Sequence, residues 1–340
     1  MTITLAGAAI TVAAILVAAG TMARLARWLG LACPRLPWPA SIMSSASAAK
    51  AEAAAPLPPT FQRRDLWCAL VVVGLGNGIA ARAITAIGEV GWADAIYSTF
   101  DVSIIVWAAC AVLLGRVWAL PEAPVRRVDL AVACACTGAF LLPVGQASWV
   151  GLTLLSVHMT VSSPRGSEGR RAAALLLALT LAMLWARLLL SVFSGPLLRT
   201  DAALVAALLG VQAMDNTVPL ADGSGVLWIA PACSSVLNLA LTLLCAQTFL
   251  ARSGRPWTLR AVLWTLVAGA LVFALNIVRL AVLAAFPRSY DVLHGPAGQG
   301  VFGLLTLAVI VGVLVLGGVG GEARRGPRPL QPVRDEGATP

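Results

Sequence analysis

Long apolar runs are the feature that most constrains what this chain can fold into. The runs lie at about residues 3–21, 66–83, 102–118, 128–143, 148–161, 172–193, 230–250, 261–285 and 299–319. A membrane-spanning helix needs about 20 apolar residues, and these runs do not alternate as the strands of a membrane barrel would. We therefore predict an all-α, polytopic transmembrane bundle. It has about eight or nine spans, because the run at 148–161 is short.

Composition and charge agree with a membrane protein. Of the 340 residues, 59% are hydrophobic and 11% are charged, whereas a soluble domain carries about a quarter charged residues. The net charge of +9 comes from arginines in short loops between apolar runs. No basic stripe is interleaved with aromatic residues, so nucleic acid is not expected as a partner and the lipid bilayer is.

The basic residues predict an orientation. Most of the 24 lysine and arginine residues lie in alternate loops, at Arg24–Arg64, Arg116–Arg127, Arg165–Arg171, Arg252–Arg260 and Arg324–Arg334. Basic loops stay on the cytoplasmic side, which places the C-terminus inside and, for nine spans, the N-terminus outside. The first run lacks the basic leader of a signal peptide and is expected to be a retained span.

The chain divides into three predicted regions. Residues 1–161 form an N-terminal membrane region with a flexible cytoplasmic linker at 36–60, which is rich in Ala, Ser and Pro. Residues 162–320 form a membrane core, and residues 321–340 a disordered cytoplasmic tail. Within the core, residues 202–229 are expected outside, first as an interfacial stretch and then as a short extended hairpin before Cys233.

Three reactive side chains stand out in this core. Cys233 lies where the apolar helix after the hairpin is expected to begin, with Pro231 in its first turn. Arg279 lies about four-fifths of the way along the next span, and His294 at the start of the last. Because these spans alternate in direction, the topology predicts all three at the outer face of the membrane.

These residue types suit acyl transfer through a thioester. A thiol near a helix N-terminus and a cation is activated as a nucleophile, so Cys233 is the candidate nucleophile. His294 is the candidate general acid and base, and Arg279 the candidate stabiliser of an oxyanion. Asn276 lies three residues before Arg279 and is expected to orient it. Gly298 is expected, with Gly295 and Gly300, to allow close helix packing.

Other interpretations of the same residues remain open. Each also has an ordinary structural interpretation: Cys233 as a structural thiol, His294 as an interfacial side chain, and Arg279 as a guanidinium that extends to the headgroups. Arg187 also lies within a span and is expected to extend likewise or to pair with Asp201 or Asp215. His158 receives no role. No cofactor is expected, because neither a Cys-x-x-Cys pair nor a metal-ligand cluster is present in the sequence.

The ordered set of motifs resembles the exosortase/archaeosortase family over about residues 172–319. The motifs are Ala232-Cys233-Ser234, Asn276-x-x-Arg279 and His294-x-x-x-Gly298-x-x-x-Phe302. The resemblance implies an integral membrane cysteine transpeptidase, with Cys233 as nucleophile, Arg279 as stabiliser and His294 as acid and base. The chain departs from the family pattern at Pro231, where an acidic residue is usual, and at Ser235, where glycine is usual.

The resemblance also implies partners and a location. Its substrates would be membrane-anchored proteins that end in a hydrophobic helix and a basic tail, which the enzyme cleaves and transfers to a surface acceptor. The expected location is a bacterial inner membrane, with the site on the periplasmic face. The alternatives are a membrane acyl- or glycan-transferase in exopolysaccharide export, and a transporter or scaffold in which Arg279 lines a pathway.

Overall fold

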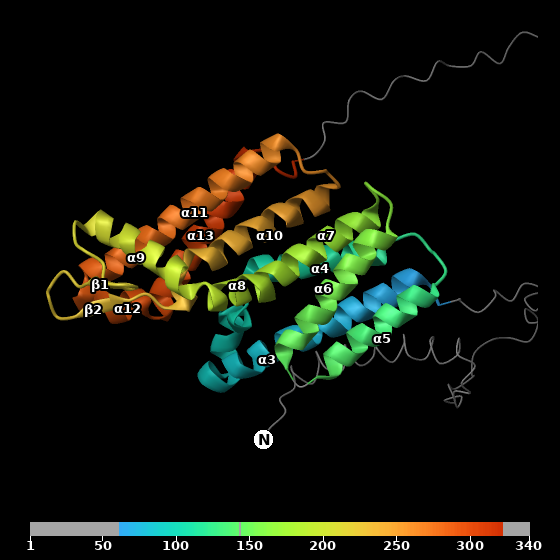
Figure 1. Ribbon diagram of the computed structural model, residues 1–340, viewed down its shortest axis with the longest axis horizontal. Coiled ribbons are helices and arrows are strands. Elements are labelled where there is room, and N and C mark those ends of the chain that lie inside the picture. The colour runs from blue at the N-terminus through green and yellow to red at the C-terminus, as the bar shows by residue number, and fades with distance from the viewer. Residues whose placement is uncertain (1–60, 143, 322–340) are drawn as a thin grey trace, which may run out of the picture.

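The computed structural model describes residues 61–142 and 144–321, which form a helical bundle with one small hairpin (Figure 1). The predicted span at 3–21, the linker at 36–60 and almost all of the tail at 321–340 lie outside the described residues. The principal helices are α3 (Arg63–Tyr97), α4 (Ile104–Trp118), α5 (Arg127–Leu141), α6 (Gly145–Ser162), α7 (Glu168–Thr180), α8 (Ala186–Val192), α9 (Ser194–Leu209), α10 (Ser235–Ser253), α11 (Leu259–Ala285) and α13 (Pro296–Leu316).

Short elements complete the chain. They are the 3₁₀ turns η2 (Thr99–Asp101), η4 (Pro231–Cys233) and η5 (Pro287–Ser289), the π-helical segment η3 (Leu181–Trp185) and the helix α12 (Tyr290–His294). Strands β1 (Thr217–Pro219) and β2 (Val226–Trp228) pair antiparallel, with Val218 opposite Leu227. The extended hairpin predicted before Cys233 is therefore confirmed, and residues 202–209 belong to the helix α9.

The predicted all-α class is confirmed, whereas the predicted number of eight or nine spans is not. Five described helices are long and apolar enough to cross a membrane: Arg63–Ile96, Glu168–Val192, Ser235–Ser253, Leu259–Ala285 and Gly298–Leu316. The predicted run at 102–118 forms a 15-residue apolar helix, which is about 22 Å long and shorter than the roughly 30 Å hydrocarbon core. The run at 128–143 is likewise only 15 residues of helix.

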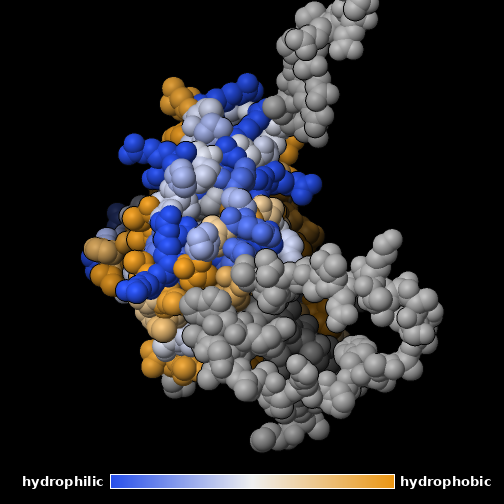
Figure 2. Space-filling view, turned by 90° about the vertical axis from the view of Figure 1, so that its right-hand side faces the viewer, coloured by the Kyte–Doolittle hydropathy of each residue, from blue (hydrophilic) through white to orange (hydrophobic). Residues whose placement is uncertain are grey.

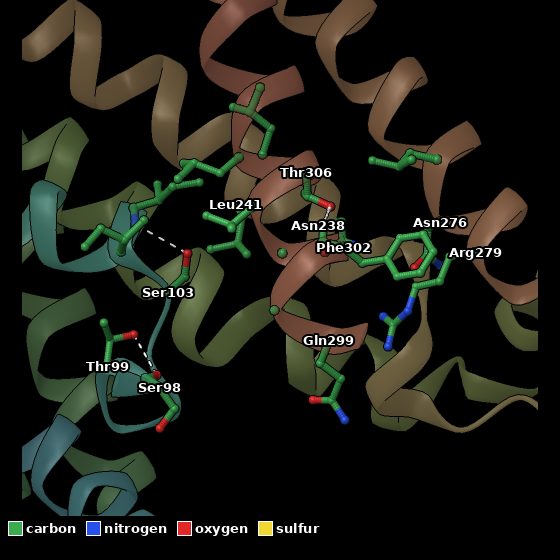
Figure 3. Close-up of a pocket in the computed structure, with 18 residues that line it drawn as sticks. Ser98, Thr99, Ser103, Asn238, Leu241, Asn276, Arg279, Gln299, Phe302 and Thr306 are labelled. Atoms are coloured by element: carbon green, nitrogen blue, oxygen red, sulfur yellow. Dashed lines mark hydrogen bonds between the residues drawn. The ribbon is translucent and has the colours of Figure 1, made fainter. Parts of the chain in front are cut away.

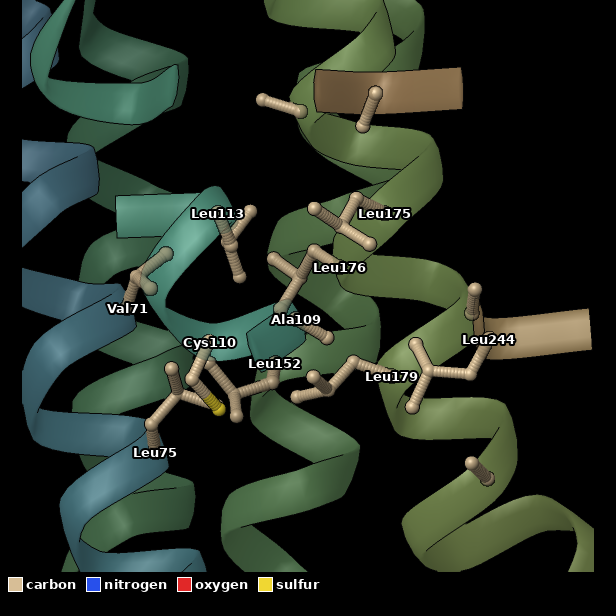
Figure 4. Close-up of a cluster of buried hydrophobic side chains, with 14 of the residues drawn as sticks. Val71, Leu75, Ala109, Cys110, Leu113, Leu152, Leu175, Leu176, Leu179 and Leu244 are labelled. Carbon is tan, nitrogen blue, oxygen red and sulfur yellow. The ribbon is translucent and has the colours of Figure 1, made fainter. Parts of the chain in front are cut away.

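Two apolar clusters hold the helices together. The larger cluster joins α3, α4, α6, α7 and α10 through side chains such as Leu113, Leu152 and Leu179, all fully buried (Figure 4). It therefore draws on helices from both sides of residue 161. The smaller cluster joins α9, the hairpin and the end of α11, through Val205, Val218 and Leu280. This second cluster fixes the segment that carries Cys233.

The arginine-rich loops meet at one end of the bundle. Arg116 pairs with Glu168 and donates to the carbonyl oxygen of Arg252 at 2.7 Å, and Arg171 also pairs with Glu168. Arg64 pairs with Glu122 at 2.7 Å. Figure 2 looks onto this end, where hydrophilic side chains gather. The hairpin, α9 and α12 lie at the opposite end (Figure 1), so the predicted alternation of basic and other loops is present among the described residues.

Candidate functional site

Cys233 lies in a tight turn between the hairpin and α10. Ile229 and Asn216 exchange two hydrogen bonds, of 3.0 and 3.1 Å, which fix the exit of the hairpin. Pro231 then opens the 3₁₀ turn, and the backbone N–H of Cys233 donates to the carbonyl oxygen of Ala230 at 2.9 Å. The side chain of Cys233 is half-buried against the smaller apolar cluster and forms no disulfide with another described cysteine.

The prediction that Cys233 begins an apolar helix is wrong in detail. Ser234 has extended backbone angles, and its side chain accepts from the backbone N–H of Val236, so α10 begins at Ser235. A serine cap satisfies a free N–H at the start of a helix. Cys233 therefore precedes the helix by two residues, and Pro231 opens the 3₁₀ turn instead of α10. Cys233 still lies just before the positive N-terminal end of α10.

A polar network supports this turn from behind. The side-chain amide of Asn276 donates to the carbonyl oxygen of Cys233 at 2.9 Å and to Oγ of Ser235 at 3.1 Å. Asp201 of α9 is buried, and its Oδ2 accepts from the backbone N–H of Ser235 at 3.3 Å. In the described part of the chain Asn276 makes no hydrogen bond to Arg279. Its predicted role is thus corrected: it orients the cysteine turn.

Arg279 lies six residues before the end of α11, at the position that the sequence predicts. Its guanidinium carbon stands 5.5 Å from the ring centroid of Phe302 on α13, within the range of a cation–π contact. Its Nε is buried and has no hydrogen-bond partner among the described residues, and it forms no ion pair there. Figure 3 shows Arg279 beside Phe302 at a cavity of about 430 Å³.

His294 closes the short helix α12, and the last long helix begins two residues later at Pro296. Its ring stacks on Tyr290, with centroids 5.0 Å apart and an interplanar angle of 14°. Its Nδ1 is buried without a partner in the described residues. Gln299 donates to the carbonyl oxygen of His294 at 2.7 Å. The histidine is thus held at the mouth of α13, one element earlier than predicted.

The predicted glycine packing takes a different form. A Cβ on Gly298 would lie 2.1 Å from the carbonyl oxygen of Leu293, and one on Gly295 would lie 2.4 Å from that of Asp291. Both glycines therefore permit the tight turn from α12 into α13, not an approach of two long helices. Gly300 has open space around it.

The fold brings the three candidate residues to one end of the bundle, but not into direct contact. Asn276 connects the cysteine turn to α11, one helical turn from Arg279, and Phe302 connects Arg279 to α13. Within residues 61–142 and 144–321, no hydrogen bond joins Cys233, Arg279 and His294 to one another. Catalytic hydrogen bonds are often long before substrate binds. The cavity is lined by Asn276 and Arg279, but not by Cys233 or His294.

Other polar groups have partners of their own. Asp215 pairs with Arg199, and Asp201 binds Ser235, so neither is the partner of Arg187 that we expected. His158 contacts Asp129 at 2.7 Å, and Arg63 contacts the same carboxylate at 2.9 Å, near the arginine-rich end. Across the described chain, no group of three His, Cys, Asp or Glu residues is arranged to hold a metal.

Sequence reasoning missed two residues of this region. Asp201 was considered only as a partner for Arg187, although an isolated acid in an apolar stretch indicates a specific partner. Tyr290 was not considered, although it lies four residues before His294, on the same helical face.

Comparison with protein-family models, with curated proteins and with solved structures finds no match to this chain.

Proposed function

We propose that this chain is an integral membrane cysteine transpeptidase or protease that resembles the exosortases. It would cleave C-terminal sorting signals of membrane-anchored proteins and transfer the proteins to a surface acceptor. The observation that carries the proposal is the convergence of Cys233, Arg279 and His294 at one end of the bundle, where η4, the last turns of α11 and α12 meet in the smaller apolar cluster. A half-buried cysteine just before a helix N-terminus, together with a guanidinium Nε and an imidazole Nδ1 that have no hydrogen-bond partner among the described residues, supplies the groups that thioester chemistry uses.

The chemistry would proceed in two steps. His294 accepts the thiol proton of Cys233, and the resulting thiolate attacks the scissile carbonyl; the oxyanion that forms is stabilised by the guanidinium of Arg279. Collapse of this intermediate breaks the C–N bond and gives a thioester, while His294 donates that proton to the leaving amine. His294 then accepts a proton from the acceptor nucleophile, which attacks the thioester and releases the thiolate of Cys233; return of the proton from His294 restores the thiol. Water in place of the acceptor gives hydrolysis.

Orientation and location belong to the same proposal. The arginine-rich end would face the cytoplasm, and the end with the cysteine turn would face the periplasm of a cell with a bacterial inner membrane. Substrates would approach within the bilayer, each with a hydrophobic helix and a basic tail. The buried network of Asn276 and Asp201 supports the assignment of Cys233, since such a network holds a reactive side chain in place.

The test is substrate processing in cells that carry Cys233→Ala. The matched control is Cys245→Ala, because Cys245 is a buried thiol of α10, away from the turn. We expect uncleaved precursors, seen as a size shift of proteins with a single C-terminal hydrophobic helix, with Cys233→Ala only. Arg279→Gln is expected to slow cleavage by roughly 10²–10³-fold. Normal processing by an inserted Cys233→Ala protein would exclude the thiol mechanism and favour a transporter or scaffold.

A further inference from the structure

A groove runs between α13 and the start of α4. One wall comes from α13, the other from Ser98, Thr99 and Ser103 at the α3–α4 connection, and α10 contributes Asn238 and Leu241 between them (Figure 3). In the most apolar stretch of α13, 11% is buried inside the protein, whereas 39–61% is buried in the corresponding stretches of the other four candidate spans. Because the described residues cover so little of α13, they leave room for another molecule along its exposed side.

The groove changes character along its length. At the end that carries Arg279, its lining includes Gln299 and Ser98, whereas further along α13 it includes Leu307 and Ile310. Figure 3 shows the side chains of Arg279 and Gln299 directed to the same side of the groove. From Gln299 to Ile310, α13 rises about 16 Å. That is about half of the roughly 30 Å hydrocarbon core, or one leaflet of a bilayer.

The polar end of the groove carries an unmatched positive charge. None of the described residues that line the groove is acidic, and Arg279 has a buried Nε without a partner among the described residues. A guanidinium in a low-dielectric setting requires an anion or hydrogen-bond acceptors. The planar fork of arginine fits a phosphate well. Phosphate is also the anion that lipid headgroups supply at this depth.

We infer that this groove binds an anionic phospholipid of the leaflet on the Cys233 side of the membrane. The phosphate contacts Arg279 and Gln299, and one acyl chain lies against Leu241, Leu304 and Leu307, which line the groove. The site also gives a role to the first half of the described chain, since the α3–α4 connection forms a wall of it. Binding does not require the chain to be a peptidase, although both proposals use Arg279.

The α3–α4 wall has an unusual backbone that fits a binding role. Thr99, Phe100 and Asp101 all have positive φ, of 52°, 59° and 55°. Three successive non-glycine residues in this region are costly, and such strain clusters at ligand sites. The wall is nonetheless fixed: Ser103 caps α4 by accepting from the backbone N–H of Ile105, and Trp107 donates to the carbonyl oxygen of Thr99 at 3.2 Å.

The test measures lipid retention by the purified full chain in detergent. Dioleoyl-phosphatidylglycerol, dioleoyl-phosphatidylcholine and inorganic phosphate are added separately, and bound lipid is counted by native mass spectrometry, with the thermal unfolding midpoint as a second readout. We expect phosphatidylglycerol to be retained and to raise the midpoint, phosphatidylcholine to be retained less, and phosphate alone to do neither. Loss of the charge contact in Arg279→Gln is expected to weaken retention by about tenfold.

Variants of the apolar half separate the groove from the rest of the lipid-facing surface. Leu241→Trp and Leu307→Trp, from two different helices, are expected to fill the groove and to abolish retention. The control is Leu266→Trp, because Leu266 is 63% exposed on α11 and does not line the groove. The control is expected to retain the lipid as the unmodified chain does.

Several results would overturn the inference. Equal lipid retention by all variants would show that the groove is not the binding site. Equal retention of the two lipids would show that the negative charge of the lipid plays no part in binding. A midpoint raised by phosphate alone would make this an anion site without a lipid. If the groove retains a single-span hydrophobic peptide and no phospholipid, it takes a helix. The proposed function has a separate test, because normal substrate processing by Cys233→Ala would contradict it. Cys233 does not line the groove, so this substitution is not expected to change lipid retention.

Discussion

At the scale of single residues, Asp201 is the group whose ionisation most affects the cysteine turn. Burial raises the pKa of this carboxyl above its usual range, although the hydrogen bonds from Ser235 and Ser234 oppose the effect. A raised pKa in the folded state means that the folded chain binds the proton more tightly than the unfolded chain. The cost of ionising Asp201 is therefore absent below a pH of about 4 and fully present above the raised pKa.

Asp201→Asn removes this cost while an amide oxygen still accepts from the backbone N–H of Ser235. We expect the thermal unfolding midpoint of Asp201→Asn, minus that of the unmodified chain, to grow as the pH rises from about 4 to 7. The control is Asp222→Asn, on the exposed hairpin turn, where hydrogen bonds from Ser224 lower the pKa of the carboxyl. The charge of Asp222 stabilises the fold above the pKa of the unfolded chain. The difference in midpoint between Asp222→Asn and the unmodified chain is therefore expected to become more negative as the pH rises. A pH-independent difference for Asp201→Asn would contradict this account.

At the scale of elements, the turn from α12 into α13 positions His294. A Cβ on Gly298 would lie 2.1 Å from the backbone oxygen of Leu293, so Gly298→Ala must displace α12 or the first turn of α13. We expect a loss of about 1–3 kcal/mol in the free energy of unfolding, as for other overpacked sites. The measurement is denaturant unfolding in mild detergent.

The matched control is Gly312→Ala on the same helix. A Cβ there meets nothing within 4 Å, and alanine is favoured over glycine in a helix interior by about 0.5–1 kcal/mol. Gly312→Ala is therefore expected to stabilise the chain slightly, or to leave it unchanged. If both substitutions had the same effect, helix propensity alone would account for the result, and the turn at Gly298 would not be a tight one.

The elements also show how far sequence reasoning reaches. Runs of apolar residues and turn residues predict the long helices and the hairpin, because these depend on local pattern. The start of α10 was misplaced by a few residues, since a capping serine and a 3₁₀ turn decide it. Asn276 was placed near the site, but its partner is 43 residues away along the chain. Contacts of that kind depend on tertiary packing, which no local pattern encodes.

At the scale of the whole molecule, the two ends of the bundle differ in charge, and this difference predicts which side each end faces. The arginine-rich loops meet through Arg116, Glu168 and Arg252 at one end, while the hairpin and α12 lie at the other (Figure 1). Basic loops are retained in the cytoplasm. We expect alkaline phosphatase inserted after Ser224, on the hairpin turn, to be active, because this enzyme folds only outside the cytoplasm.

The reciprocal fusion provides the control. A green fluorescent protein inserted after Gly254, where α10 ends, is expected to fluoresce. This protein matures in the cytoplasm, whereas copies that are exported in an unfolded state do not become fluorescent. The same fluorescent protein after Ser224 is expected to be dark. An active phosphatase at Gly254 together with a fluorescent fusion at Ser224 would invert the bundle. Inversion would place Cys233 on the cytoplasmic side, where exported substrates are not found, and the proposed transpeptidase would lose its access to them.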